Sequence, residues 1–392
     1  MIGGLVTFGF GGRLGEGDAP TDARGTPSPS LSSPEPVELV VPTKRAPTTM
    51  LAWTASGIPA SIAASLSGSP GVAGVVRVVA GIDWIAKTVA EEGTVIDQPS
   101  GGRFIPLDIA VVPPTAYSAF VKPSERQLIR SLDGRSAVLS VTGAELRRAR
   151  AGMKIYLRDR TVTVVGIVSD DSTGGYEALV GGAVPGSWTR EYPFLLVALE
   201  RASARAKVGK RVERMVGAGT PLQLRAQGET PFLRYGDSVL SEAYVKVLFG
   251  EFSAIPLPDG TLDVDPAYRA DHIITAPVPI LGEVTCNRAI FPALRRVMRQ
   301  IINEGLEHII DPADFGGCYS PRTIISGPGA RLSHHAYGIG FDLNVSENAY
   351  ARQPRLDPRI VKIFEANDFT WGGRWLVPDG MHFEWNSFPA AD

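Results

Sequence analysis

The chain has little cysteine, little histidine and almost no net charge. Its 392 residues include two cysteines and five histidines, and their formal net charge is −2. Two cysteines are too few for a disulfide scaffold, and neither lies at zinc-finger spacing from another cysteine or a histidine. A near-neutral chain also lacks the basic domain or stripe that nucleic-acid binding requires. We therefore expect no nucleic-acid partner.

No stretch of the sequence combines the length and the apolar character of a membrane-spanning helix. Residues 50–76 carry no charge, but glycine, proline and serine interrupt them repeatedly, which makes a spanning helix improbable. The first twelve residues are apolar and rich in glycine, yet they lack a basic n-region and a clear cleavage site. We expect no transmembrane segment in this chain, and no export signal is clearly visible.

Composition divides the chain into three parts. Residues 1–36 end in a stretch dense in glycine, proline and serine with few bulky apolar side chains, so they predict a disordered or linker segment. The remaining length exceeds that of a usual single domain. Turn-forming residues cluster just before and around residue 228. We therefore expect a mixed module over 37–228 and a second domain over 229–392.

Strand patterns dominate residues 37–228. Apolar and β-branched runs predict the strands Val37–Val41, Val72–Ile82, Ile105–Val112, Ser136–Val141 and Pro193–Leu199, and a hairpin of 155–157 with 161–165. Helices are predicted at 143–152 and 203–216, with a short helix or turn at 58–66. The module contains no histidine and no cysteine. We expect it to position or to bind, and it could contact a protein partner.

We predict that the second domain, residues 229–392, has an α+β fold with an antiparallel sheet and flanking helices. Apolar residues recur at helical spacing over 292–304, with arginines between them and a glycine at the end. A second helix is predicted at 358–366. Residues 245–258 and 273–284, rich in proline and β-branched residues, are predicted to be extended.

Three of the five histidines lie in two short segments, 333–342 and 379–385. Zinc hydrolases hold their metal with three protein ligands and leave one position for water, whose pKa the metal lowers. His335, Asp342 and His382 would supply two imidazoles and a carboxylate. We therefore predict that these two segments form the two halves of one metal site, which binds a single Zn²⁺ ion.

Asp379 lies three residues before His382. A carboxylate so close to a ligand can reach a metal-activated water without binding the metal itself. It can then accept the proton of that water and deliver it to the leaving amine. We predict that Asp379 is the general base.

These segments resemble a known family. Residues 333–342 read S-x-H-x-x-G-x-G-x-D, which is similar to the S-x-H-x-x-G-x-A-x-D signature of the bacterial zinc D-Ala-D-Ala carboxypeptidases. That family also includes D-Ala-D-Ala dipeptidases and L-Ala-D-Glu endopeptidases. Gly340 replaces the alanine of the signature, one small residue for another. The resemblance spans about 281–385 and says nothing about residues 37–228.

The second family motif is an acidic residue followed by x-x-H, and residues 379–384 read D-x-x-H-F-E after W-G-G at 371–373. Many members have glutamate in the acidic position, so the aspartate resembles the endopeptidase-like branch. The resemblance also implies an upstream arginine that contacts the substrate carbonyl and the developing oxyanion. Arg322 is the favoured candidate for this role, and Arg331 competes with it.

Several neighbouring residues have other interpretations. His334 is the alternative ligand, one residue out of the register of the signature, and Ser333 is expected only to hydrogen-bond the turn. Glu384 is expected to orient a ligand histidine. The remaining residues considered are expected to be structural or to line the rim: Trp371, Trp375, Trp385, His272 and His308.

The resemblance implies a zinc peptidase that hydrolyses peptidoglycan stem peptides outside the cytoplasmic membrane. Two alternatives stay open: an envelope binding or scaffolding protein with a catalytically weak zinc domain, and a zinc amidase of another fold. If the protein is exported, Cys286 and Cys318 could form a disulfide. Which peptide bond is cleaved does not follow from the metal ligands.

Overall fold

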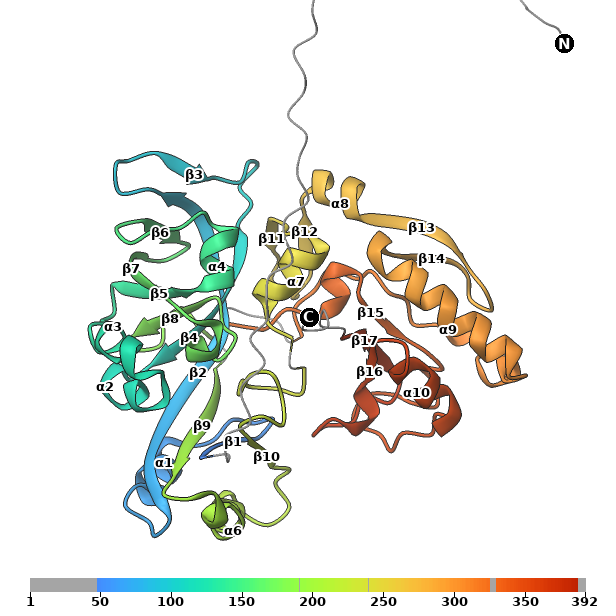
Figure 1. The fold of residues 1–392 in the computed structure, drawn as a ribbon. Helices are drawn as coiled ribbons and strands as arrows, with labels where there is room; N and C mark the ends of the chain where they lie inside the picture. The colour runs from blue at the N-terminus through green and yellow to red at the C-terminus, as the bar shows by residue number, and fades with distance from the viewer. Residues whose placement is uncertain (1–47, 190, 239, 325–328, 387–392) are drawn as a thin grey trace, which may run out of the picture. The chain divides into compact units, whose positions relative to one another are not determined.

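The computed structural model describes residues 48–189, 191–238, 240–324 and 329–386 (Figure 1). All of them fall in one compact unit. The predicted linker over 1–36 and the predicted strand Val37–Val41 lie outside the described residues. Within those residues, no helix has both the length and the apolar character needed to cross a membrane.

A ten-stranded mixed sheet occupies most of the first half of the chain. Its strands are β1 (Thr49–Trp53), β2 (Val72–Val89), β3 (Val95–Asp97), β4 (Ile105–Val112), β5 (Ser136–Ser140), β6 (Lys154–Leu157), β7 (Thr161–Val168), β8 (Ala178–Gly181), β9 (Tyr192–Leu199) and β10 (Gln223–Ala226). The order is β10-β1-β9-β2-β4-β8-β5-β7-β6, and β3 pairs with β2. Most pairs are antiparallel, but β4–β8 and β5–β7 are parallel.

Part of this sheet closes on itself. The 18-residue strand β2 pairs with β4 at one edge and with β6 further along, so the path from β2 through β4, β8, β5, β7 and β6 returns to β2. All eight residues of β4 are buried. Ile105, Leu107 and Ile109 belong to one hydrophobic cluster, whereas Ala110 and Val112 belong to another. This alternation is the period-two pattern of a strand covered on both faces.

Short helices cover the sheet. They are α1 (Ala60–Leu66), α2 (Pro114–Tyr117), α3 (Arg126–Arg130), α4 (Val141–Leu146), α5 (Asp170–Thr173) and α6 (Arg205–Val216). The helix predicted at 143–152 was placed too far along the chain. It begins two residues earlier because the Ser140 side chain accepts a hydrogen bond from Gly143 N at 2.9 Å, which caps its first turn.

The second half of the chain combines hairpins and helices. Its elements are α7 (Glu242–Phe249), β11 (Ala254–Pro256), β12 (Leu262–Val264), α8 (Pro266–His272), β13 (Ile273–Val278), β14 (Gly282–Asn287), α9 (Phe291–Asn303), β15 (Gly340–Asp342), α10 (Pro358–Glu365), β16 (Phe369–Trp371) and β17 (His382–Trp385). The predicted helices at 292–304 and 358–366 are confirmed as α9 and α10. The predicted extended segment 245–258 is wrong over its first part, because α7 is a helix.

The predicted antiparallel sheet is confirmed as β15–β17–β16, drawn in red in Figure 1. Phe341 of β15, Phe383 of β17 and Phe364 of α10 are fully buried and pack as a ring cluster. The side chains next to these phenylalanines along both strands point the opposite way. The core thus fixes which face of the sheet carries Asp342 and His382.

The two halves share buried contacts. The hydrophobic cluster beneath the small sheet also includes Ile82 and Trp84 of β2. Four charged side chains also join the halves. Arg147, just after α4, and Glu177, just before β8, pair with Lys246 of α7 and with Glu251. The domain boundary near residue 228 stays a prediction.

Candidate metal centre

A short 3₁₀ helix, His334–Tyr337, presents His335. The Ser333 side chain accepts a hydrogen bond from His335 N at 3.3 Å and begins the helix. Gly338 ends it in the left-handed conformation, with φ of 68°, which a side chain would disfavour. The serine and the first glycine of the motif therefore shape the turn, and Ser333 has the local hydrogen-bonding role expected for it.

The small sheet places Asp342 beside His382. Asp342 on β15 lies directly opposite His382 on β17, and residues paired in this way project from the same face of an antiparallel sheet. Gly340 lies two residues earlier, and a Cβ atom there would come within 2.9 Å of His382 Cε1. Gly340, where the resembled signature has alanine, thus leaves room for the His382 ring.

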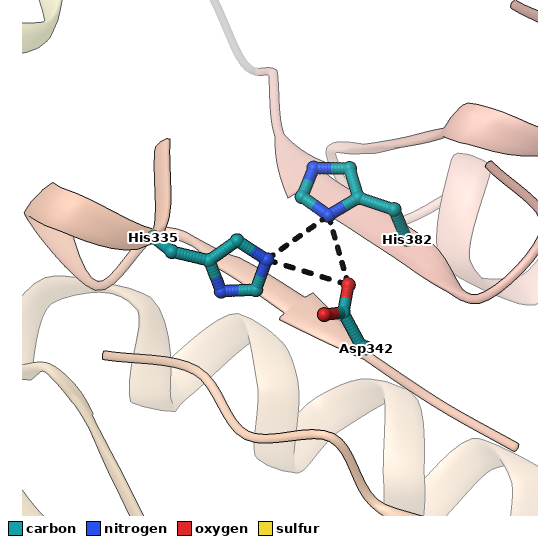
Figure 2. Close-up of side chains that lie close together, drawn as sticks. All are labelled: His335, Asp342 and His382. Atoms are coloured by element: carbon teal, nitrogen blue, oxygen red, sulfur yellow. Dashed lines mark hydrogen bonds and ion pairs between the residues drawn. The ribbon is translucent and has the colours of Figure 1, made fainter. Parts of the chain in front are cut away.

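The three predicted ligands converge on one point (Figure 2). His335 Nε2 lies 3.2 Å from His382 Nδ1 and 3.3 Å from Asp342 Oδ1, and His382 Nδ1 lies 3.0 Å from Asp342 Oδ1. All three residues are buried, and their donor atoms lie within 4.8 Å of one another. No second set of this kind occurs among the residues that the structure describes.

The donor set fits a zinc ion. Two imidazoles and one carboxylate are a common set of protein ligands in catalytic zinc sites, and a fourth position then remains for water or substrate. The surroundings also favour a cation. Burial lowers the pKa of His382, but hydrogen bonds and charge from Asp342 and Glu384 outweigh it and raise that pKa to about 10. The centre of the site therefore stabilises positive charge.

Each ligand histidine is oriented by a contact to the ring nitrogen that does not face the other two ligands. His335 Nδ1 lies 2.8 Å from the Cys318 carbonyl oxygen, which directs Nε2 towards Asp342. His382 Nε2 lies 3.5 Å from Glu384 Oε2. Partners of this kind fix the ring orientation of metal-binding histidines. The position of Glu384 agrees with the orienting role expected for it, whereas the contact from Cys318 could not be foreseen because it is made by the backbone.

His334 faces away from the donor set. Its Nδ1 atom lies 2.8 Å from Glu384 Oε2. Burial raises the pKa of the Glu384 carboxyl, but the neighbouring His334 and His382 outweigh burial and hold that pKa well below its usual range. His334 thus supports Glu384, and the geometry disfavours the alternative in which His334 replaces His335 as a ligand.

Asp379 lies at the end of the loop that leads into β17. Its backbone carbonyl accepts a hydrogen bond from His382 N at 3.2 Å, and its own N–H donates to Gly372 O at 2.9 Å. Its Oδ1 atom is buried and has no hydrogen-bond partner among the described residues. Burial is the main reason that the pKa of this carboxyl is raised to about 6. A carboxyl with this environment can exchange a proton near neutral pH.

Arg322 and Arg331 lie next to the isolated bridge between Thr323 and Leu332, but they have different surroundings. Arg322 Nη1 donates to Ser320 O at 3.5 Å, and Ser320 N donates to His335 O at 3.0 Å, so Arg322 lies close to the backbone of a predicted ligand. The guanidinium of Arg331 lies over the Tyr235 ring, 5.5 Å from its centre. The geometry favours Arg322 over Arg331 for contact with substrate, and the role itself stays a prediction.

The remaining aromatic and histidine residues divide into rim and core. Trp375 lies beside the site, with its ring 5.2 Å from the His382 ring. Trp385 packs edge-on against Phe249, with the ring centres 5.0 Å apart. His272 stacks on Tyr268 at 4.6 Å. Trp371 donates from Nε1 to Gly380 O, and His308 is exposed.

Cys286 and Cys318 form a disulfide. The bond ties β14 to the segment whose carbonyl orients His335. The same segment is held at Gly316 and Gly317 by backbone hydrogen bonds to Asp342. The disulfide thus holds in place the segment that contacts His335 and Asp342. The sequence had left open whether these two cysteines are paired.

Residues 326–385 match the sequence model of a family described as D-alanyl-D-alanine carboxypeptidase. The matched segment contains the three donors and Asp379, and Arg322 lies just outside it. The match spans less than half of the chain. It supports a peptidase of the D-Ala-D-Ala carboxypeptidase kind for the C-terminal region. No curated protein matches the chain.

Two solved structures are similar to part of the chain. One is the periplasmic region of MacB from Actinobacillus actinomycetemcomitans, at 11% identity over 46% of this chain and 88% of that chain, with a TM-score of 0.31. The other is the extracellular domain of the noncanonic ABC-type transporter YknZ from Gram-positive bacteria, at 14% identity over 46% and 99%, with a TM-score of 0.30. At these TM-scores the likeness carries no inference about this chain.

Proposed function

We propose that this protein is a zinc-dependent peptidase that hydrolyses peptidoglycan stem peptides. One observation carries the proposal. The buried donor set of His335, Asp342 and His382 lies within the segment that matches the D-alanyl-D-alanine carboxypeptidase family. A structural metal site would close all four positions with protein ligands, whereas three ligands leave room for water and substrate.

The chain's own side chains supply the remaining chemistry. A zinc ion held by the three donors would polarise the scissile carbonyl and acidify a water molecule. Asp379 accepts a proton as the water attacks and returns it to the leaving amine, a task suited to a carboxyl whose pKa burial raises to about 6. Arg322 stabilises negative charge that develops on the carbonyl oxygen. Trp375 shields one side of the His382 ring.

The proposed site of action is outside the cytoplasmic membrane. Disulfides persist in oxidising compartments and are rare in the bacterial cytosol, and Cys286–Cys318 joins two segments that flank the donor set. A D-Ala-D-Ala carboxypeptidase and an L-Ala-D-Glu endopeptidase both remain compatible with the ligands, since the walls of the substrate pocket decide between them.

The experiment measures metal content and hydrolysis on the full chain. Purified protein is analysed for bound metal, and defined muropeptides are digested and examined by mass spectrometry, which identifies the bond that is cut. His382→Ala is expected to lose both the metal and hydrolysis. Asp379→Ala is expected to keep the metal and to lose about 10²–10⁴-fold in rate. The matched controls are the exposed residues His308 and Asp271, each changed to alanine.

The outcomes separate the alternatives. Wild-type hydrolysis by both His382→Ala and Asp379→Ala would sink the proposal. Retained metal without turnover of any wall peptide would support a binding or scaffolding protein. Cleavage of the bond between sugar and peptide would indicate an amidase.

A further inference from the structure

The loop Gly372–Gly380 joins β16 to β17 and carries two residues of the site. Trp375 lies beside the His382 ring, and Asp379 is the proposed base. The ends of the loop are tied to each other, because Asp379 N donates to Gly372 O at 2.9 Å. The loop is also held within its own region, because Trp375 N donates to Gly372 O at 3.0 Å and Ala351 N donates to Pro378 O at 2.7 Å. Leu376 lies between these contacts and needs an anchor of its own.

That anchor comes from the ten-stranded sheet side of the molecule. Leu376 N donates a hydrogen bond to Asp237 Oδ2 at 3.0 Å. The Leu376 side chain packs against the hydrophobic cluster that contains Tyr235 and strand residues of β2, β4 and β9. A loop of the peptidase region is therefore held, by one polar and one apolar contact, on the core of the other region.

Asp237 is itself fixed in place. Its Oδ1 lies 3.5 Å from Arg225 on β10, and both side chains are largely buried, with 14% and 7% exposure. Just before it, Arg234 pairs with Asp108 of β4 at 2.7 Å, and Tyr235 donates from its hydroxyl to Thr54 O at 3.1 Å. This short connecting segment is thus pinned to the sheet at each of these residues.

We propose that Asp237 is a positioning residue, through which the sheet module of residues 48–226 holds the Gly372–Gly380 loop and so places Trp375 and Asp379. The sheet module is then a platform for the catalytic loop. The catalytic part of this inference rests on the proposed function, whereas the anchoring of the loop does not depend on it.

Two substitutions of Asp237 distinguish its role as a hydrogen-bond acceptor for Leu376 N from the effect of its negative charge. Asp237→Asn keeps a carbonyl oxygen that can accept from Leu376 N, but it removes the negative charge. Asp237→Ala removes both. If the acceptor is what matters, asparagine retains the anchor and alanine loses it. The matched control is Asp263→Ala, because Asp263 on β12 also contacts the sheet module, through Arg103 at 3.1 Å, but does not touch the loop.

The first measurement is amide hydrogen exchange of the full metal-free chain, followed by mass spectrometry of peptides that cover residues 372–380. We expect Asp237→Ala to speed exchange in these peptides about tenfold, since one hydrogen bond protects the loop locally. Asp237→Asn and Asp263→Ala are expected to exchange like the wild type. Unchanged exchange in Asp237→Ala overturns the inference, as does exchange that is equally fast in Asp237→Asn or in Asp263→Ala.

The second measurement is hydrolysis by the metal-loaded protein. Asp237→Ala is expected to lower kcat about ten- to a hundredfold, to change KM less, and to keep the bound metal, because a displaced base impairs chemistry more than binding. Loss of metal in this variant would contradict a positioning role. If the wild type hydrolyses no wall peptide, the proposed function fails, and the exchange experiment still decides whether the loop is anchored.

Asp237→Ser guards against a folding failure. It keeps a polar side chain at this position but shortens it, so the carboxylate acceptor for Leu376 N is lost. If Asp237→Ala does not fold, faster exchange at 372–380 in Asp237→Ser supports the inference, and unchanged exchange overturns it.

Discussion

Buried charge is arranged differently in the two regions of this molecule. Where the sheet module meets α7, two cations and two carboxylates close on one another. Lys246 Nζ lies 2.6 Å from Glu177 and 3.2 Å from Glu251, and Arg147 pairs with the same two carboxylates. At the metal centre, by contrast, three donors point at a shared space, and Asp379 retains a buried oxygen that has no hydrogen-bond partner among the residues the structure describes.

The pKa values of the two regions reflect this difference. Burial raises the pKa of Glu251, but the adjacent Arg147 and Lys246 outweigh burial and lower it. Burial also raises the pKa of Asp379, and there it prevails, to about 6. A strongly perturbed group therefore indicates structure where opposite charges outweigh burial, as at Glu251, and a candidate for proton transfer where burial prevails, as at Asp379.

The largest effect is expected in the cluster of buried ion pairs formed by Arg147, Glu177, Lys246 and Glu251. Lys246→Met leaves two buried carboxylates with a single cation, so we expect the free energy of unfolding to fall by about 3–5 kcal/mol. Metal stoichiometry should not change in protein that remains folded. Denaturant unfolding of the variant and the wild type measures the difference. The control is Arg148→Ala, whose side chain is 73% exposed and should matter little. A loss below about 1 kcal/mol for Lys246→Met would show that the cluster is not a structural device.

The second prediction concerns the two arginines near the open site. Arg322→Ala is expected to lower kcat about 10²–10³-fold, as the removal of an oxyanion donor does. Arg331→Ala should cost less than about tenfold, because its guanidinium packs on Tyr235. Steady-state kinetics on one defined muropeptide compares the two. A larger loss for Arg331→Ala would reverse their assignment.

The third prediction concerns the disulfide. Replacing both Cys286 and Cys318 by alanine should lower the free energy of unfolding by about 2–4 kcal/mol, because the bond closes a loop with a sequence separation of 32. Metal affinity should fall as well, since the Cys318 carbonyl orients His335. Chemical unfolding and chelator competition measure the two effects. Reductant should shift the wild type towards the variant and leave the variant itself unchanged; equal shifts in both proteins would contradict the prediction.

Sequence patterns predicted the donor set because metal ligation requires particular residue types at particular spacings. They also predicted the long buried strands β4 and β9, whose residues are apolar apart from Asp108 in β4. They missed α7, which is rich in β-branched and aromatic residues and resembles a strand. The Ser241 cap and the pairing of Lys246 with the distant Glu177 favour the helix there.

Other features had no signal in the sequence. The carbonyl of Cys318 orients a ligand through a backbone atom, which residue type does not reveal. Asp237 lies in a segment that resembles a linker, and its partner Leu376 is 139 residues away in sequence. Contacts of this kind depend on the packing of the two regions, so local patterns cannot predict them.

The smallest expected effect is a difference in pH dependence between hydrolysis, which needs ionised Asp379, and folding, which involves the ion pairs of Glu251. Asp379 must be ionised to accept a proton, and burial raises its pKa to about 6, so hydrolysis should fall about tenfold for each pH unit below that value. The carboxyl of Glu251 has a lowered pKa, so its ion pairs should persist through the same range. The profile of kcat/KM against pH, recorded beside thermal unfolding, tests both statements. Unchanged hydrolysis well below pH 6 would mean that Asp379 is not the proton acceptor. If folded protein is lost in parallel with hydrolysis, acid disrupts the ion pairs of Glu251 before it protonates Asp379.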